Sequence, residues 1–481
     1  MRSAFLGLEI ARRALLTHQR ALDVVAHNIA NAATPGYVRR EPVLAATEGF
    51  VVETGAGFKR PGTVGTGVEV ARIKRVFDGF LESRIRQSGV TLGLWEGRHD
   101  ALSQVEAIFG EPSDVGLADA LNKFFAAWDE LAKRPESIPI RTALVEEAKT
   151  LAAFFNQTTR GLRDLARDLD EGITTRIDEI NSLASEIAAQ NREIVRITAI
   201  GNDPADLKDK RDLAIARLSR LISIRAFEVG GGSVVIEVGS TELVRGDSVN
   251  ELNFTSGTPL GEPIPAGEVE ASRVSWSDDG SPVDIRGGEV GGLLQVRNGD
   301  LPTYYKDVEN LIKALRDEIN ALHTAGFGLD GSQGAEFYLY DDATRVLSVS
   351  SVLDPDAGGD VSRVAASKTG EAGDGANALA IASLKDALTM SGGTVSFRGF
   401  YQQTIANLGT DARQAAYMVQ VHEATLHQYT NNKDNLSGVA IDEEVANLMR
   451  YQRAYEAAAR LATVIDQMLD TLINGTGIVG R

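Results

Sequence analysis

An apolar stripe with a seven-residue repeat at each end of the chain limits most strongly what this sequence can fold into. Near the start, spacings of three and four alternate through Leu8, Ala11, Leu15, His18, Leu22, Val25 and Ile29. Near the end, the same spacings run through Leu448, Tyr451, Tyr455, Ala458, Ala462, Ile465, Leu469 and Leu472. These spacings are typical of a coiled-coil seam, so each end is expected to form one long helix that needs a partner.

A terminal helix of this kind is not stable by itself. Burying one large apolar side chain contributes about 1.5–3 kcal/mol, so the last stripe provides on the order of 10–15 kcal/mol. Ordering the roughly 30 backbone residues costs about 1–2 kcal/mol for each, before hydrogen bonds are counted. The two helices therefore either pair with each other or stay unfolded until neighbouring subunits cover them. We interpret the ends as assembly elements and the middle as the independently folded body.

The stretch after the first helix predicts a turn, a strand and a return to helix. Pro35 disfavours helical geometry at the residue before it, so the first helix is expected to end near Ala33. Residues 34–37 (Thr-Pro-Gly-Tyr) fit a type II turn, because proline sets φ at its second position and glycine supplies a positive φ at its third. A strand is expected within residues 68–76, and Asp78 is a good N-cap for the next helix.

The middle of the chain predicts a helical body with one β insertion. Helical periodicity extends from about residue 88 to residue 221. Short β-rich runs between residues 224 and 245 are separated by glycines, and helix returns at residue 301. The expected fold class is mainly α with a β insertion: long coiled-coil-like terminal helices, a helical-bundle body and a small, mainly β outer domain. The expected units are terminal helices (1–35 and 438–481), a mainly helical body (36–223 and 300–437) and a mainly β outer domain (224–299).

Composition argues against several classes of function. A net charge of −18 disfavours binding to nucleic acid or to anionic membranes, because both depend on clustered Lys and Arg. The chain has no cysteine, so disulfides and thiolate chemistry are excluded. No stretch approaches the roughly 18–20 apolar residues of a membrane span. The apolar run at residues 4–8 is too short for a cleaved signal peptide, so any export is expected to use an uncleaved N-terminus.

A search for catalytic and metal-binding patterns yields no site. His422 and His427 are five residues apart, about 140° around a helix, whereas the zinc protease motif needs a spacing of four. The glycines of residues 62–67 lack the Lys-Ser/Thr of a phosphate loop. We therefore expect no enzyme activity, no cofactor and no metal site. His323 is expected to have a capping or core role, and Asn191 either sets helix register or faces solvent.

Motifs at both ends resemble the terminal signatures of the bacterial flagellar axial protein family, which comprises rod, hook and hook-associated proteins. The N-terminal motif reads Asn-Ile-Ala-Asn-Ala-Ala-Thr-Pro-Gly-Tyr over residues 28–37. The C-terminal motif comprises residues 442–448, 451–455 and 468–472. The N-terminal resemblance is carried by Asn28, Asn31, Thr34, Pro35, Gly36 and Tyr37.

Three internal segments are similar to segments of the hook-associated members of that family. They are residues 206–212, residues 288–294 with Arg297, and residues 320–331. The hook protein lacks the long helical section between residues 88 and 221. Hook and rod subunits are therefore the weaker alternatives within the family.

The resemblance implies a structural subunit of the bacterial flagellum that self-assembles at the hook–filament junction and connects the hook to the filament. The implied partners are further copies in a ring of the axial tube, the hook protein, a second junction protein on the filament side, and a cytosolic export chaperone at the C-terminal region. The terminal helices are implied to form the inner tube, and the location is extracellular, without insertion into a membrane. The stripe residues expected at the assembly interface are Leu8, Leu15, Leu22, Val25, Ile29, Leu448, Tyr451, Tyr455, Ile465, Leu469 and Leu472.

Two alternatives from other functional classes stay open. A soluble hydrolase with helical and β domains would need a catalytic constellation, which the motifs do not supply. An adhesin would use the β insertion as its binding module, and glycan binding to residues 224–300 would test this alternative.

Overall fold

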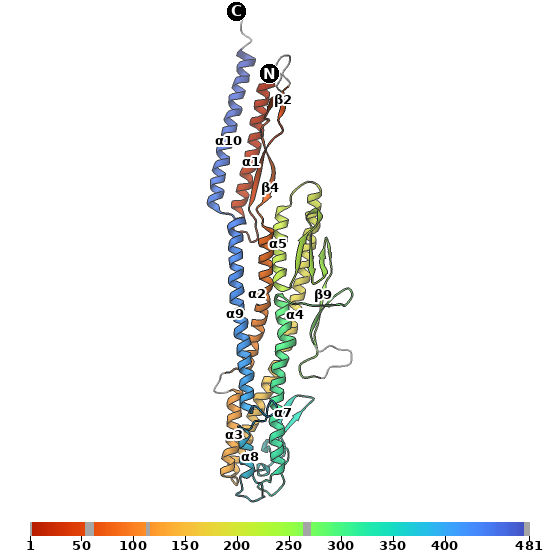
Figure 1. The fold of residues 1–481 in the computed structure, drawn as a ribbon, viewed down its shortest axis with the longest axis vertical. Helices are drawn as coiled ribbons and strands as arrows, with labels where there is room; N and C mark the ends of the chain where they lie inside the picture. Colours follow the sequence, from red (N-terminus) through yellow and green to blue (C-terminus); the bar gives the residue numbers. More distant parts are fainter. Residues whose placement is uncertain (1, 53–61, 112–115, 263–270, 476–481) are drawn as a thin grey trace, which may run out of the picture.

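Long helices run along the molecule and give it an elongated shape, with both chain ends at the same end (Figure 1). The computed structural model describes residues 2–52, 62–111, 116–262 and 271–475. The helices are α1 (Arg2–Ala30), α2 (Gly79–Phe109), α3 (Leu117–Lys133), α4 (Ile138–Ala199), α5 (Ala205–Leu221), α6 (Gly288–Gln295), α7 (Leu301–Ala325), α8 (Ala376–Ser383), α9 (Phe397–Ser437) and α10 (Ile441–Asp470). This mainly α architecture confirms the predicted fold class.

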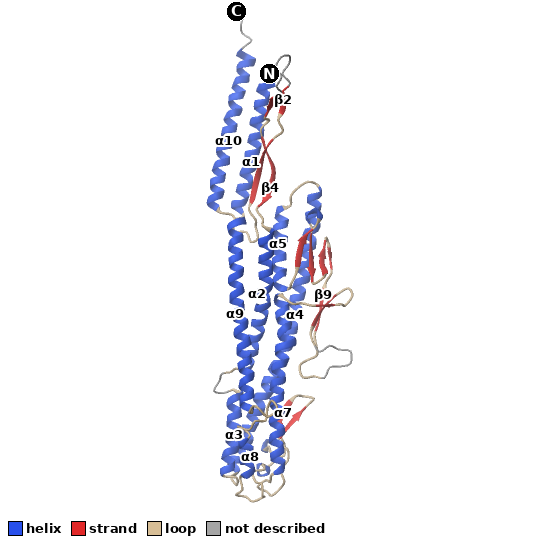
Figure 2. Cartoon of the chain, viewed as in Figure 1, coloured by secondary structure: helices blue, strands red, loops and turns tan. Residues whose placement is uncertain are grey.

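The strands form small antiparallel sheets beside the helices (Figure 2). The first strands are β1 (Arg40–Ala46), β2 (Phe50–Val52), β3 (Gly62–Val64) and β4 (Val68–Arg75). Those of the insertion are β5 (Arg225–Glu228), β6 (Val234–Val238), β7 (Thr241–Arg245), β8 (Ser248–Val249), β9 (Leu252–Thr255), β10 (Arg273–Trp276) and β11 (Pro282–Val283). A further pair, β12 (Tyr338–Asp341) and β13 (Val346–Val349), follows α7.

The terminal helices α1 and α10 lie antiparallel along each other at one end of the molecule (Figure 1). Ala21, Val25 and Tyr451 form the buried centre of this pair. Each helix thus covers part of the other's apolar stripe within one chain, which is the first of the two outcomes that the stripes allowed. The chain joins α9 to α10 through a short break at Gly438.

A hairpin-like sheet of β1 and β4 packs on α1. Thr17 Oγ1 on α1 donates to Val68 O at 2.9 Å, which fastens β4 to the helix. The chain enters β1 through the predicted turn: Gly36 has φ +79°, and Tyr37 N donates to Thr34 O at 3.2 Å. Because the hairpin packs on α1, we propose that β1 and β4, together with the turn before β1, belong with the terminal helices, whereas the sequence-based division placed them in the body.

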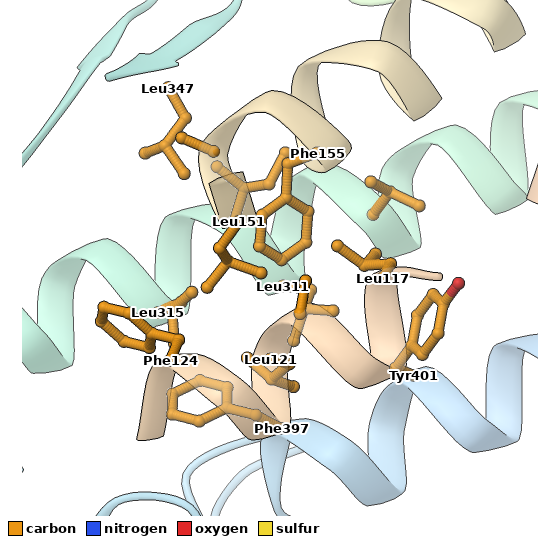
Figure 3. Close-up of a cluster of buried hydrophobic side chains, with 14 of the residues drawn as sticks. Leu117, Leu121, Phe124, Leu151, Phe155, Leu311, Leu315, Leu347, Phe397 and Tyr401 are labelled. Atoms are coloured by element: carbon orange, nitrogen blue, oxygen red, sulfur yellow. The ribbon is translucent and has the colours of Figure 1, made fainter. Parts of the chain in front are cut away.

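The body is a bundle in which α4, 62 residues long, is the longest helix. Its main core lies where α3, α4, α7 and α9 meet, and Phe124, Phe155 and Phe397 are fully buried there (Figure 3). The predicted N-cap of α2 is confirmed, because the Asp78 carboxylate accepts from the amides of its second and third residues. Asp203 followed by Pro204 predicts a helix capped by Asp203, but α5 begins one residue later, and Asp203 instead accepts from Lys208 Nζ at 2.9 Å.

The insertion builds a four-stranded sheet (β5-β6-β7-β8) and a three-stranded sheet (β11-β10-β9). Both pack against α4 and α5 through a second core, in which Ile187, Leu218, Ile236 and Trp276 are buried. A stripe of isoleucines on α4 (Ile173, Ile177, Ile180 and Ile187) therefore faces these sheets and supplies the apolar surface that short strands need.

Asparagine side chains fasten the sheets to the helices. Asn181 on α4 donates from Nδ2 to Leu252 O and accepts from Leu252 N, both at 2.9 Å. Asn191 pairs in the same way with Val234 of β6, at 2.8 and 3.0 Å. Each amide thereby satisfies a strand N–H and C=O as a neighbouring strand would. The same two-point pairing joins Asn28 to Arg40, Asn156 to Leu347, Asn298 to Ser272 and Asn320 to Tyr338.

Candidate assembly surface

The terminal unit, defined here as α1, the β1–β4 hairpin and α10, contains most of the residues that the sequence singled out. Close approach of its two helices depends on a glycine at position 7. A Cβ atom at Gly7 would lie 2.9 Å from Ile465 Cδ1, so the Ile465 side chain packs directly over the backbone of α1. Nearby, the His18 and Tyr451 rings lie with their centroids 6.4 Å apart across the same seam.

Asn28, the first residue of the N-terminal motif, is fully buried where the terminal helices meet the hairpin. Its Nδ2 donates to Arg40 O at 2.8 Å and to Glu444 Oε2 at 3.0 Å. Its Oδ1 accepts from Tyr37 OH at 2.7 Å and from Arg40 N at 3.1 Å. Burial raises the pKa of Tyr37 to about 12, so its hydroxyl keeps the proton that it donates. This single amide joins α1, the hairpin and α10.

The other motif residues shape the turn that leads out of α1. Asn31 Nδ2 donates to His27 O at 3.0 Å, and its Oδ1 accepts from Thr34 Oγ1 at 3.2 Å. Gly36 has a positive φ, and a Cβ there would lie 3.3 Å from Leu213 Cβ on α5. Pro35 is exposed. The motif therefore acts mainly by directing the chain from α1 into β1, close to the body.

Three aspartates on α5 hold the terminal unit against the body. Arg40 pairs with Asp206 and lies 3.5 Å from Asp209, and Arg75 pairs with Asp209 at 2.6 Å and with Asp212 at 2.9 Å. Asp209 is buried, and burial raises its pKa although Arg75 and Arg40 oppose that rise. In the sequence, residues 206–212 show only a resemblance to the family, because nothing in their spacing identifies arginines far away in the chain as partners.

The residues predicted at the assembly interface fall into two groups. Those that are buried or half-buried are Leu15, Leu22, Val25, Ile29, Leu448, Tyr451, Ile465 and Leu469. Those that are exposed are Leu8, Tyr455 and Leu472. A neighbouring subunit can reach the second group directly, whereas it would meet the most buried residues of the first group only if α1 and α10 separated.

A second apolar stripe on α10 is not evident from the heptad pattern. Leu461, Val464 and Met468 follow one another at spacings of three and four and are 44%, 51% and 52% exposed. Phe5 and Leu16 on α1 are similarly exposed. Contiguous exposed apolar side chains mark contact sites rather than ordinary surface. A search of the two terminal helices for apolar residues outside the heptad stripes would have identified these side chains from the sequence.

No helix in the described part of the chain is long and apolar enough to cross a membrane. Within those same residues, no group of three or more His, Asp and Glu side chains is placed to hold a metal ion.

His323 has a core role: it is fully buried, and its Nε2 accepts from Ala365 N at 2.9 Å. Asn191 is also fully buried, so the alternative expectation that this side chain faces solvent is wrong.

Family models match three parts of the chain. The model described as flagellar hook-associated protein FlgK helical domain matches residues 102–338. The flagella basal body rod protein model matches residues 8–37, and the flagellar basal body rod FlgEFG protein C-terminal model matches residues 434–475. Rod-type sequences at both ends, folded as one antiparallel helix pair, define a flagellar axial protein.

Similarity over the full length identifies the branch of that class. The flagellar hook-associated protein 1 of Bacillus subtilis (strain 168) is 30% identical, over 100% of both chains. The protein of the same name from Escherichia coli (strain K12) is 23% identical, over 95% of this chain and 97% of its own. This chain belongs to the flagellar hook-associated protein 1 family.

A solved structure shares the fold. The flagellar hook junction protein FlgK from Burkholderia pseudomallei aligns with a TM-score of 0.62 at 15% identity, over 74% of this chain and 100% of that chain.

Proposed function

We propose that this chain forms a ring of the axial tube between hook and filament, and that its terminal unit makes the contacts within that tube. The supporting observation is the exposed stripe of Leu461, Val464 and Met468 on a helix whose other side already packs on α1. Burying a large apolar side chain contributes about 1.5–3 kcal/mol, so a few such residues on each copy favour ordered association. The role is structural and not catalytic.

The proposed partners follow from the position of the ring. They are further copies of the chain, the hook protein on one side and a second junction protein on the other. Before export, a cytosolic chaperone would cover the apolar surface of α10, which otherwise promotes premature association. The proposed location is the outside of the cell, at the hook–filament junction.

Deletion of the gene tests the junction role. We expect hooks without filaments in electron micrographs and flagellin released into the medium. Loss of hooks as well would place the protein at the rod or hook. Normal flagella would refute the proposal.

Complementation of that deletion tests the surface. Leu461→Asp combined with Met468→Asp introduces charges on the exposed stripe only, so the chain should be made and exported but should not restore filaments. Leu461→Met combined with Met468→Leu preserves apolar volume and should restore them. Filaments with the Asp variant would show that this stripe is not an assembly surface.

A further inference from the structure

A groove of about 870 Å3 lies between α1, β4 and the turn that joins α4 to α5. Its apolar lining includes Val24, Val70 and Ile73, and Ile73 is 41% exposed. Arg20 and Arg72 also line it, are exposed, and make no ion pair with any described residue. The groove therefore combines an apolar base with free positive charge.

The other charges of the groove leave this positive excess in place. Arg40 is already paired with aspartates of α5, and Asp203 is paired with Lys208. Asp23 is an exposed carboxylate that opposes the two free arginines. A ligand for this groove should be apolar and carry negative charge at its edge.

The first turns of α10 carry a surface of that kind. Ile441, Val445 and Met449 recur every fourth residue and are 55%, 37% and 50% exposed. Asp442 is exposed beside them and makes no ion pair with any described residue. Glu443, 66% exposed, pairs with Arg39 of the same chain at 2.8 Å. We call Ile441, Val445 and Met449 the waist stripe.

The groove and the waist stripe lie at the same level of the molecule. Glu444 bonds to Asn28, so the first turns of α10 lie beside the last turns of α1, which line the groove. They face different sides, because α1 stands between α10 and β4 (Figure 1). A copy therefore cannot place its own stripe in its own groove. A contact between two different surfaces of identical chains can repeat around a ring.

The charge distribution favours another copy as the occupant. Residues 1–77 contain 11 Lys and Arg against 6 Asp and Glu, a net charge of +5, whereas the whole chain has −18. Copies of an acidic chain repel one another unless a positive region of one meets a negative region of the next. The groove lies partly in that positive region, and the flank of the waist stripe is negative.

We propose that the waist stripe of one copy docks in the groove of the next copy and sets the lateral contact of the ring. This inference rests on the proposed function and adds the surfaces by which neighbouring copies meet. In the contact, Asp442 of one copy faces Arg72 of the next, while Val445 and Met449 cover Ile73.

The absence of cysteine makes the contact directly testable, because an introduced pair reports one contact. Ile73→Cys and Val445→Cys are made singly and together in the full-length chain and expressed in the deletion strain, and isolated flagella are oxidised. Coexpressed single variants should give a covalent heterodimer. The double variant should give a ladder beyond the dimer, because each copy contributes both surfaces. If this pair disturbs assembly, Ala71→Cys with Asp442→Cys samples the same contact at exposed positions.

Charge reversal provides a second test. In the chain that carries Ile73→Cys and Val445→Cys, Arg72→Glu should lower the yield of cross-linked product about tenfold. Adding Asp442→Arg should restore that yield. Lys74→Glu is the matched control, because Lys74 is exposed on the same strand but does not line the groove, and it should leave the yield unchanged.

The outcomes separate this inference from the proposed function. Cysteine variants that restore filaments but give no cross-link would overturn the contact and leave the junction role intact. A gene deletion without effect on flagella would remove the junction role itself. If a thiol-to-amine cross-linker at position 73 captures hook or filament protein instead of a second copy, the groove belongs to that partner and the inference is wrong.

Discussion

Asn28 and Glu444 are hydrogen-bonded, Nδ2 to Oε2 at 3.0 Å, although 416 positions separate them in the chain. Both side chains are buried, and the bond places the first turn of α10 at the end of α1. The two motifs that identify the family at opposite ends of the sequence are thus in direct contact. The pair lies where α1, α10 and the hairpin meet, so it has measurable consequences for the terminal unit.

Asn28→Ala should destabilise the terminal unit, because it leaves the Glu444 carboxylate and the Arg40 backbone without buried partners. An unsatisfied buried polar group costs about 1–3 kcal/mol, and more if it is charged. Faster proteolysis of α1 and α10 in the full-length chain is the expected result. Asn31→Ala is the control, since Asn31 is only partly buried and bonds locally. Equal proteolysis rates for both variants would contradict the central role of Asn28.

Arg75→Ala should loosen the attachment of the hairpin to α5. It removes the closer of the two arginine partners of Asp209, whose side chain is 7% exposed, and breaking a buried ion pair costs about 3–5 kcal/mol. Hydrogen exchange of the β4 amides should accelerate strongly. Arg39→Ala breaks the more exposed pair with Glu443 and should cost less than about 1 kcal/mol. Unchanged β4 protection in Arg75→Ala would show that the network does not hold the hairpin.

His323 should make the stability of the body depend on pH. Burial lowers the pKa of His323 to about 4, from 6.5 in the unfolded chain. Between these values only the unfolded chain binds the proton, so stability falls as the pH falls from about 6.5 to about 4, by at most about 3 kcal/mol. Urea unfolding of the wild type and of His323→Gln measures this effect. The difference in unfolding free energy between the wild type and His323→Gln should shrink on acidification. A difference that stays constant with pH would show that His323 is not the source of the pH dependence.

Asn181→Asp should weaken the outer sheets. The substitution removes the donor to Leu252 O and places a carboxylate beside that carbonyl, for an expected loss of about 1–3 kcal/mol. Denaturant unfolding together with exchange of the Leu252 amide provides the measurement. Ala189→Glu adds the same charge at an exposed position of the same helix and should be nearly neutral. Similar losses in both variants would attribute the effect to charge alone.

Ile465→Asp combined with Leu469→Asp should separate α10 from α1 without unfolding the body. Ile465 is buried against Gly7, so a carboxylate there loses its hydration. We expect rapid proteolysis of α10, a partial loss of helical circular dichroism that leaves the signal of the body in place, and no incorporation into flagella. This outcome differs from that of Leu461→Asp with Met468→Asp, in which α10 should stay paired. Normal incorporation of the Ile465 and Leu469 variant would show that the helix pair is not needed for assembly.

Local patterns in the sequence determined the types of most elements and several of their limits. The stripes predicted α1 and α10, Pro35 and Gly36 predicted the turn at Tyr37, and Asp78 predicted the start of α2. These predictions succeed because periodicity, proline and glycine geometry and capping act within a few residues of the position concerned.

Only the tertiary structure decided which surfaces are covered. Spacing alone did not distinguish Ile465, which packs on Gly7, from Tyr455 and Leu472, which belong to the same stripe but are exposed. It also did not reveal that Arg75 meets Asp209, or that Asn181 would pair with a strand of the insertion. Helical and strand periodicity show which side chains share a face, but the partner of that face is set by contacts between segments far apart in the chain, where packing and hydrogen-bond satisfaction select one arrangement.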